Sequence, residues 1–265
     1  METAATATRE LKIVREPRVY VVGRQVVSDE AIAQFLGDEE RTWQTDTEVG
    51  AEKLAEIAGR VCYMSYGRGR KTNADFISHL IDVGHGSVLE HGVWSFVITG
   101  VSRSFTHELI RHRHFSYSQL SQRYVDESDA SFVIPPAIIG DEALVAQWKA
   151  QVEGAQATYV SLVEKLMERY SWVADKVHRR KMAREAARGV LPNSTETKIV
   201  VTANARAWRT MLELRTGEGA EQEIRRLGVL VLRTLQAEAP GFFADFEVYT
   251  AEDRVESARI SYHKV

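Results

Sequence analysis

Residues 141–170 have the sequence DEALVAQWKAQVEGAQATYVSLVEKLMERY, in which apolar residues recur at steps of three and four. This spacing places the apolar side chains along one face of an α-helix. The positions that form this face are Leu144, Trp148, Val152, Ala155, Tyr159, Leu162, Leu166 and Tyr170. The pattern therefore predicts one long amphipathic helix.

The chain after this helix mixes helical and extended patterns. A basic stretch at 175–188 has helical composition, and Gly189 is a typical C-terminal stop. The β-branched run KIVVTA at 198–203 predicts a strand. Two further helices are predicted at 205–215 and 221–238.

The residues before the long helix show the same mixture. The valine-rich run at 18–27 predicts a strand, and Ser28 and Asp29 are good N-caps for a short helix after it. A second strand is predicted for GVWSFVITG at 92–100. Apolar spacing predicts helices at 48–61, at 73–83 with Gly84 as the C-cap, and across FTHELIRHR at 105–113.

Strands and helices are interspersed without the regular alternation that a doubly wound parallel sheet requires. We therefore expect an α+β fold, with a mixed or antiparallel sheet flanked by long helices. No repeat, low-complexity block or Pro/Gly/Ser-rich linker divides the 265 residues, which predicts a single domain over 1–265. Residues 1–10 are expected to be mobile.

The overall charge limits the classes of partner. The formal net charge is -3 and the sequence pI is near 6.3, so the chain as a whole lacks the strong positive charge of an obligate nucleic-acid binder or a polybasic membrane protein. Any binding of anions must therefore be local. The hydrophobic content of 44% allows a large core.

Cysteine usage and hydropathy bear on the compartment. A single cysteine, Cys62, cannot form an intramolecular disulfide, which fits a reducing compartment. No stretch has the apolar core of a signal peptide or the uninterrupted apolar span of a bilayer helix. We expect a soluble, cytoplasmic protein with no membrane partner.

Residues 103–124, RSFTHELIRHRHFSYSQLSQRY, contain four arginines around a single carboxylate, that of Glu108. Guanidinium groups bind phosphate or pyrophosphate through paired, charge-assisted hydrogen bonds. Helical spacing is expected to bring Glu108, Arg111 and His112 to one ligand. A solvated basic helix face explains the composition equally well.

The pattern within this segment adds information that composition lacks. RHRHFSYSQLSQRY at 111–124 resembles the signature RHRxxSxNxxSxRY of the flavin-dependent thymidylate synthases, the ThyX family. Three further blocks resemble that family in the same order, and together they extend the resemblance over roughly residues 50–250. These blocks are GHGSVLEH at 84–91, ARGVLPNSTET at 187–197 and LELRTGEGAEQEIR at 212–225.

The resemblance implies a ThyX-like fold and a set of site residues. For dUMP it implies Glu108, Arg111, Gln119, Leu120, Ser121, Gln122, Arg123 and Arg188. For FAD it implies Ser87, Glu90, Arg111, His112, Arg113, Gln119, Asn204, Ala205 and Arg206. It implies His85 beside the pterin of the folate, and Arg215 as the catalytic residue that stabilises uracil ionised at N3.

The resemblance also implies the reaction and the assembly. The expected reaction is reductive methylation of dUMP to dTMP, with 5,10-methylenetetrahydrofolate as carbon donor, FAD reduced by NADPH as hydride donor, and tetrahydrofolate released. No enzyme nucleophile is implied, because ionisation at N3 makes C5 of the uracil nucleophilic. The expected assembly is a homotetramer in which residues of different subunits form each FAD site.

The chain departs from the family pattern at four positions. Ser118 stands where the signature has asparagine, and Gln119 where many members have glutamate. Gly219 occupies a position that usually carries histidine beside flavin and folate, and Thr210 one that usually carries asparagine or histidine. The hydrogen bonds to the nucleotide and the stacking of flavin on folate are where differences are expected.

Two other motifs invite sharper interpretations. HELIRH at 107–112 has histidines five residues apart, which a helix separates by roughly 140°, so no metal site is expected. GRGRKT at 67–72 lacks both phosphate-loop spacings and predicts a flexible basic loop, with a minor role in the approach of NADPH or folate left open.

Two further features have simpler alternatives. Cys62 lies beside Val61 and Tyr63 on an apolar helix face, which favours a buried, inert thiol over a nucleophile. The basic helix within 176–188 offers the alternative function of binding nucleic acid, although a solvated face is the simpler interpretation. Its basic residues are Lys176, Arg179, Arg180, Lys181, Arg184 and Arg188.

Overall fold

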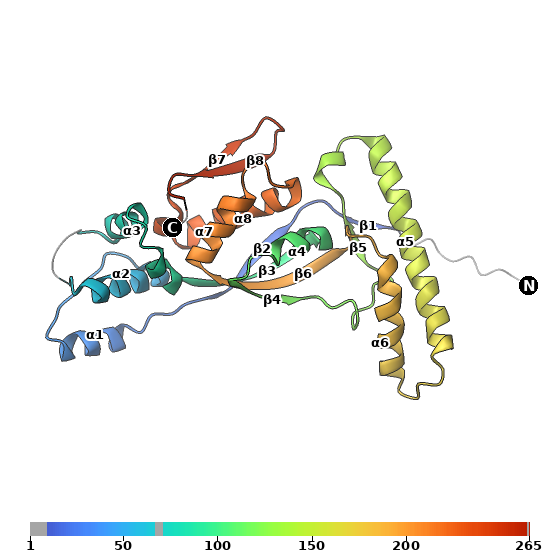
Figure 1. The fold of residues 1–265 in the computed structure, drawn as a ribbon, viewed down its shortest axis with the longest axis horizontal. Helices are drawn as coiled ribbons and strands as arrows, with labels where there is room; N and C mark the ends of the chain where they lie inside the picture. The colour runs from blue at the N-terminus through green and yellow to red at the C-terminus, as the bar shows by residue number, and fades with distance from the viewer. Residues whose placement is uncertain (1–9, 67–70, 264) are drawn as a thin grey trace, which may run out of the picture. The chain divides into compact units, whose positions relative to one another are not determined.

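The computed structural model describes residues 10–66, 71–263 and 265 (Figure 1). Its helices are α1 Asp29–Asp38, α2 Gly50–Tyr63, α3 Asn73–Asp82, α4 Arg103–Leu109, α5 Glu142–Arg169, α6 Lys176–Ala187, α7 Ala205–Arg215, α8 Gln222–Glu238 and α9 Pro240–Phe243. Its strands are β1 Lys12–Val14, β2 Arg18–Arg24, β3 Val93–Ser102, β4 Phe115–Gln119, β5 Ser131–Val133, β6 Glu196–Asn204, β7 Phe246–Thr250 and β8 Glu256–Ile260. Short 3-10 helices are η1 Gly86–His91, η2 Pro136–Ile138 and η3 Arg188–Val190.

The strands form one larger sheet and two ribbons. The four-stranded sheet has the order β2-β3-β6-β4. Strands β1 and β5 pair in parallel, with Ile13 opposite Phe132, whereas β7 and β8 pair antiparallel, with Val248 opposite Ala258. The expected α+β fold, with a mixed or antiparallel sheet and long flanking helices, is confirmed.

The chain divides into two units by its internal contacts. The first comprises residues 1–17, 99–107 and 119–198, and the second residues 18–98, 108–118 and 199–265. Strands β3 and β6 each contribute residues to both units, so no single linker separates them. The single-domain assignment over 1–265 stays a prediction.

The core of the second unit is aromatic and lies against the four-stranded sheet. The Trp208 ring of α7 meets the rings of Phe96 on β3 and Phe115 on β4 edge to face, with centroids 5.0 and 4.7 Å apart. Trp94 of β3 meets Phe242 and Phe243 of α9 in the same manner. Edge-to-face packing of buried rings fixes α7 and α9 on this sheet.

The core of the first unit forms between α5 and the β1–β5 ribbon. Val152 of α5 is buried with Leu11, Ala130 and Phe132. Asp141 caps α5 by accepting from the backbone N–H groups of Ala143 and Leu144. The predicted long helix is therefore confirmed, although only Val152, Ala155 and Tyr159 of its apolar face are buried within this chain.

Most predicted elements appear at the predicted places, and α4 is the main exception. The helix predicted over 105–113 ends at Leu109, so Arg111 and His112 lie in the turn that follows. The Tyr117 hydroxyl donates to the carbonyl oxygens of Leu109 (2.7 Å) and His112 (2.9 Å). These carbonyls would serve the next helical turn, so the argument that placed Arg111 and His112 by helical spacing was wrong.

A second correction concerns Cys62. The thiol is exposed, not buried, because the whole last turn of α2, from Val61 to Tyr63, lies at the surface. The expected mobility of residues 1–10 and the basic loop at 67–72 fall largely on 1–9 and 67–70, outside the described residues. Among the helices described, none has the length and apolar character needed to cross a membrane.

Candidate functional site

Arg215, the last residue of α7, is held by two side chains: that of Glu108 near the end of α4 and that of His112 in the segment after it. Its Nη1 donates to Glu108 Oε2 at 2.9 Å, and its Nε donates to His112 Nε2 at 3.2 Å. The Arg215 and Glu108 side chains are 25% and 34% exposed, so the pair is reachable from solvent. These two hydrogen bonds fix the guanidinium, and its remaining N–H groups stay available to a ligand.

His112 is neutral in this arrangement. Burial of the ring and, next, the charge of Arg215 lower the pKa of His112 from 6.5 to about 4. The unprotonated Nε2 is then an acceptor, which is the form that Arg215 Nε requires. The imidazole therefore orients the guanidinium without adding a second positive charge.

The loop after Arg215 is fixed by the C-terminal ribbon. The backbone N–H of Ala258 on β8 donates to the Thr216 carbonyl at 2.9 Å, and the Tyr249 hydroxyl of β7 donates to Glu218 Oε1 at 2.9 Å. Gly219 lies in this loop with open space around the position of a side chain. Arg215 therefore lies at the end of a helix, and the loop that follows it is held in place by hydrogen bonds.

The turn after α4 carries Arg111 and Arg113. Both side chains are exposed, and neither guanidinium has a hydrogen-bond or ion-pair partner among the residues that the structure describes. Uncompensated guanidinium groups attract phosphate and pyrophosphate. This turn can accept an anion without first breaking an internal ion pair.

The other residues expected to contact FAD lie on η1 and at the start of α7. Arg206 Nη1 and Glu90 Oε1 form an ion pair at 2.7 Å, and both side chains are more than 40% exposed. A Cβ added to Gly86 would lie 2.9 Å from Arg206 Nε, so glycine permits this close approach. Ser87 is exposed on the same turn.

Asn204 and Ala205 stabilise the start of α7. The Asn204 side-chain oxygen caps α7 by accepting from the Ala207 N–H at 2.8 Å. Ala205 is fully buried, and its N–H donates to the Gly92 carbonyl at 2.8 Å. Of the pair, Asn204 Nδ2 is the group still able to contact a ligand.

His85, the expected folate contact, stacks on Tyr63. The ring centroids are 5.7 Å apart with an interplanar angle of 17°, and the Tyr63 hydroxyl lies 3.2 Å from His85 Nδ1. Tyr63 is exposed at the end of α2. The stack offers a flat surface of the kind on which an aromatic ligand binds.

The other expected dUMP residues belong to the first unit. Gln119 Nε2 donates to the hydroxyls of Thr106 (3.2 Å) and Thr197 (3.3 Å), and the Leu120 N–H donates to the Lys198 carbonyl at 2.9 Å. These bonds fix the segment that leads to Ser121. Arg123 is already paired, with its Nε 3.0 Å from Glu185 Oε2.

Arg188 lies in a strongly polar part of the same unit. Its side chain has no partner among the described residues. Partial burial lowers the pKa of half-buried Arg103, and the positive charge of Arg188 lowers it further. Glu127, only 4% exposed, has its pKa raised by burial. Gln122 Nε2 is buried without a hydrogen-bond partner in the structure. The unpartnered Arg188 guanidinium and Gln122 amide are donors of the kind that bind an anion.

The predicted dUMP set is thus divided between the two units. Glu108 and Arg111 belong to the second unit and Gln119 to Arg123, with Arg188, to the first. The structure brings Arg215, Glu108 and His112 together, and it brings Arg206 to Glu90. Two backbone N–H groups join further predicted residues: that of Arg123 donates to the Ser121 hydroxyl at 3.4 Å, and that of Arg111 to the Glu108 carbonyl at 3.2 Å. The roles of all these residues stay predictions.

The basic helix α6 uses much of its charge internally. Arg184 pairs with Asp126 at 2.7 Å, Arg179 donates to the carbonyls of Ser171 and Val173, and the Lys181 ammonium lies 5.2 Å from the Tyr124 ring centroid. A helix whose cations are engaged in this way is a poor match for a nucleic-acid backbone. In the described parts of the chain, no cluster of metal-ligating side chains was found.

Sequence patterns missed two ion pairs formed by buried arginines. Arg209 and Arg225 are each 1% exposed and pair with Asp245 and Asp253. Their partners lie 36 and 28 residues away, so no local spacing marks them. The stacking of Tyr63 on His85 had no local signal either.

Comparison with known proteins places these features in context. A family model described as thymidylate synthase complementing protein matches residues 45–241. Flavin-dependent thymidylate synthases of Mycobacterium avium (strain 104) and Mycobacterium marinum (strain ATCC BAA-535 / M) are 51% and 52% identical over 231 residues, or 86% of this chain and 92% of each relative. A crystal structure of the UMP/dUMP methylase PolB from Streptomyces cacaoi, bound with 5-Br UMP, matches with a TM-score of 0.64 at 21% identity, over 88% of this chain and 95% of that one.

Proposed function

The chain belongs to the flavin-dependent thymidylate synthase family, and we propose that it methylates dUMP to dTMP reductively, with Arg215 as the catalytic residue. The proposed carbon donor is 5,10-methylenetetrahydrofolate, and the proposed hydride source is FAD reduced by NADPH. One observation carries this proposal: Arg215 is oriented by Glu108 and a neutral His112, and part of its guanidinium faces solvent.

The residues proposed for FAD fit a dinucleotide chemically. Arg111 and Arg113 lack internal partners, which leaves two guanidinium groups for a pyrophosphate. Gly86 lets Arg206 approach the backbone of η1 next to Ser87. When bound, the flavin supplies the hydride that completes the new methyl group.

Arg215 would act on the pyrimidine electrostatically. Loss of the N3 proton spreads negative charge over the ring oxygens and raises the electron density at C5, which makes C5 a better nucleophile. A guanidinium already fixed by two hydrogen bonds stabilises that anion without reorganising during the reaction. Glu108 partly balances the positive charge of Arg215, and His112 helps to hold the orientation of its guanidinium.

The phosphate of dUMP would be bound by the first-unit residues. Arg188 has no internal partner, and Ser121 and Arg123 follow a segment that Gln119 and Leu120 hold in place. Arg123 would exchange Glu185 for the phosphate. His85, stacked on Tyr63, would contact the pterin of the folate.

Homotetramer formation, with FAD sites shared between subunits, is part of the proposal. Tyr20 and Val22 on the edge strand β2 are 46% and 57% exposed, and Leu214 on α7 is 60% exposed. Apolar side chains grouped on one strand favour association with another copy. The cytoplasmic location stays a prediction.

The test is release of tritium from C5 of labelled dUMP, with FAD, NADPH and methylenetetrahydrofolate omitted one at a time. We expect turnover only with all three. Turnover without flavin would refute the proposed chemistry.

Subunit sharing has its own test. Arg206→Ala and Arg113→Ala variants, each of low activity, are mixed after reversible dissociation. If the FAD site combines Arg206 of one subunit with Arg113 of another, mixing restores part of the activity. No recovery on mixing, or tight FAD binding by a monomer, would refute the shared site.

A further inference from the structure

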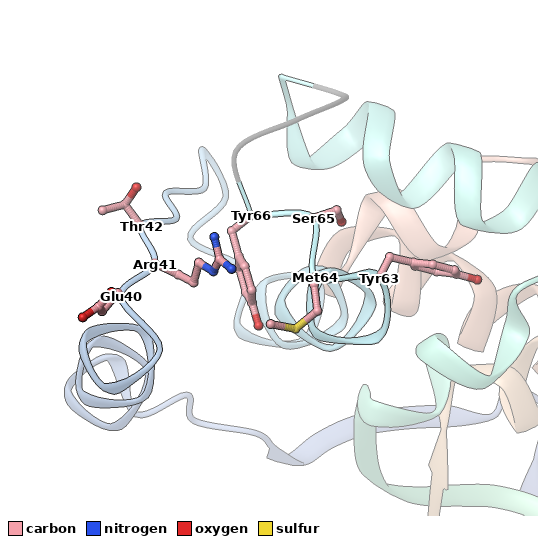
Figure 2. Close-up of a pocket in the computed structure, with 7 residues that line it drawn as sticks. All are labelled: Glu40, Arg41, Thr42, Tyr63, Met64, Ser65 and Tyr66. Carbon is pink, nitrogen blue, oxygen red and sulfur yellow. The ribbon is translucent and has the colours of Figure 1, made fainter.

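A hollow of about 490 Å³ lies in the second unit between the C-terminal ends of α1 and α2. Small-molecule sites usually enclose roughly 300–1,000 Å³, so this volume suits part of a ligand. Figure 2 shows the side chains of Arg41, Met64 and Tyr66 at the centre of the residues that line it. The residues that line it are Glu40, Arg41, Thr42, Tyr63, Met64, Ser65 and Tyr66. None of them is among the residues proposed above for dUMP, FAD or catalysis.

Tyr66 supplies a buried polar atom without a partner. Its ring is 7% exposed and lies in a cluster with Leu36 and Ile57. Its hydroxyl is buried and makes no hydrogen bond within the structure. Buried hydroxyls nearly always have a partner, so an acceptor or donor from a ligand is expected at this point.

Arg41 supplies a free positive charge at the same hollow. Its side chain is exposed and has no ion-pair partner among the described residues. In Figure 2 its guanidinium extends toward the ring of Tyr66. A guanidinium beside an aromatic wall favours a ligand that combines a ring with a carboxylate or phosphate.

The walls of the hollow are fixed by the backbone. Glu40 and Met64, at the helix ends, have φ values of 52° and 49°, in the left-handed region. The Arg41 N–H donates to the Leu36 carbonyl at 2.8 Å and the Ser65 N–H to the Arg60 carbonyl at 3.0 Å. Non-glycine residues persist in this conformation when their surroundings hold them, which indicates a preformed hollow.

Tyr63 connects the hollow to the proposed folate contact. It borders the hollow, but Figure 2 shows that its ring projects away from Arg41. That ring stacks on His85, with centroids 5.7 Å apart. A ligand whose bicyclic ring contacts His85 can therefore continue past Tyr63 toward Arg41.

We propose that the hollow lined by Arg41, Met64 and Tyr66 binds the p-aminobenzoyl-glutamate part of the folate co-substrate. This inference rests on the proposed function, because it takes His85 as the pterin contact. The benzoyl ring lies against Met64 and Tyr66, a glutamate carboxylate pairs with Arg41, and the Tyr66 hydroxyl gains its missing partner. NADPH also combines rings with anionic groups, but nothing observed connects the hollow to a second nucleotide.

The test uses the FAD- and dUMP-loaded enzyme with p-aminobenzoyl-L-glutamate as the probe, titrated by calorimetry. 4-Aminobenzamide, which lacks the glutamate, is the control ligand. Arg41→Gln removes the charge, and Arg254→Gln is the matched control, since Arg254 is also exposed and unpaired among the described side chains. Steady-state KM values for all three substrates are measured in parallel.

We expect Arg41→Gln to weaken the probe and to raise the KM for methylenetetrahydrofolate, each by about tenfold, as loss of a charge-assisted hydrogen bond predicts. The KM values for dUMP and NADPH stay unchanged, and Arg254→Gln behaves like the wild type. Tyr66→Phe weakens the probe by about threefold without lowering the melting temperature, because the hydroxyl it removes has no internal partner.

Three outcomes would overturn the inference. The first is unchanged probe affinity and unchanged folate KM in Arg41→Gln; the second is a rise in the KM for NADPH in place of folate; the third is equal binding of 4-aminobenzamide and the probe. If the wild-type enzyme turns over dUMP and one of these results is obtained, only the proposed folate-tail site is refuted. If the wild-type enzyme shows no flavin-dependent turnover, the proposed function itself is refuted.

Discussion

Arg209 and Arg225, in the C-terminal part of the chain, are almost completely buried and bound to Asp245 and Asp253. Arg111 and Arg113, in the turn after α4, are exposed and have no partner among the described residues. A buried guanidinium that is paired with a carboxylate joins parts of the fold, whereas one left without a carboxylate is available to a ligand. The comparison shows that the partner, and not the number of arginines, separates structural from binding residues.

Arg215 combines features of both regions. It has a carboxylate partner, Glu108, like the buried arginines, yet a quarter of its side chain is exposed. This combination is what electrostatic catalysis requires, because the charge must be held in place and must also reach the substrate. Substitutions in each class should therefore give effects of different kinds.

Arg209→Met should give the largest effect, and on stability. The guanidinium bonds Asp245 through two nitrogens, at 2.6 and 2.8 Å, and also the Phe242 carbonyl at 2.6 Å. Removing it leaves a buried carboxylate unpaired, which costs about 3–5 kcal/mol in the free energy of unfolding. Urea unfolding measures this, and Arg209→Met with Asp245→Leu should recover part of the loss. A stability loss below about 1 kcal/mol would show that the pair does not join these segments.

Arg215→Ala should come next, with an effect on turnover. Loss of one preorganised electrostatic contact lowers kcat by about 10²- to 10³-fold. Tritium release from dUMP measures the rate, and the flavin absorbance shows whether FAD remains bound, as we expect. Loss of FAD together with activity would instead assign Arg215 to cofactor binding.

Arg188→Gln should affect substrate affinity. Removing a guanidinium that binds a phosphate weakens dUMP by about 10- to 100-fold, with little change in the melting temperature because no internal partner is lost. Arg180→Gln on α6 is the matched control, since its side chain is exposed and also unpaired within the described chain. Equal effects of the two variants would place Arg188 outside the dUMP site.

The pKa of His112 should depend on the charge of Arg215. The ring should titrate at about pH 4, and Arg215→Met should raise this pKa while burial still keeps it below 6.5. Because the folded pKa lies below the ordinary value, the unfolded chain binds a proton first. This ring therefore contributes a loss of stability as the pH falls from 6.5 toward 4. Titration by NMR of histidine-labelled protein measures both values, and an unchanged pKa in Arg215→Met would remove Arg215 as its neighbour.

Cys62→Ala should have the smallest effect. The thiol is exposed at the end of α2 and takes part in no proposed step, so turnover and stability should change by less than about twofold and about 0.5 kcal/mol. Tritium release and urea unfolding are the measurements. A large loss of turnover would indicate covalent catalysis by Cys62.

Local patterns predicted the elements whose limits are set locally. Asp141 and Asp175 cap α5 and α6 through their own side chains, and Ser28 caps α1 in the same way. Such caps act over three residues, so the sequence itself displays them. The predicted starts of these helices agree with the structure for this reason.

The remaining features depend on residues distant in the chain. The end of α4 depends on Tyr117, which bonds carbonyls that a continuing helix would use. The exposure of Cys62 depends on which face of α2 the other elements cover. The stacking of Tyr63 on His85 joins residues 22 positions apart. The resemblance supplied Arg215, but its bonds to Glu108 and His112, 107 and 103 residues away, came from the structure.

The contact of β8 with the Thr216 carbonyl, beside Arg215, has a consequence for biosynthesis. Strand β8 is translated after α7, so for a time the nascent chain has the arginine but not the strand that secures its loop. Nucleotide affinity should consequently arise only after residues 256–260 have left the ribosome and paired with this loop. A message truncated shortly before the codon for Glu256 would yield a polypeptide in which α7 is formed but the loop after Arg215 lacks its support.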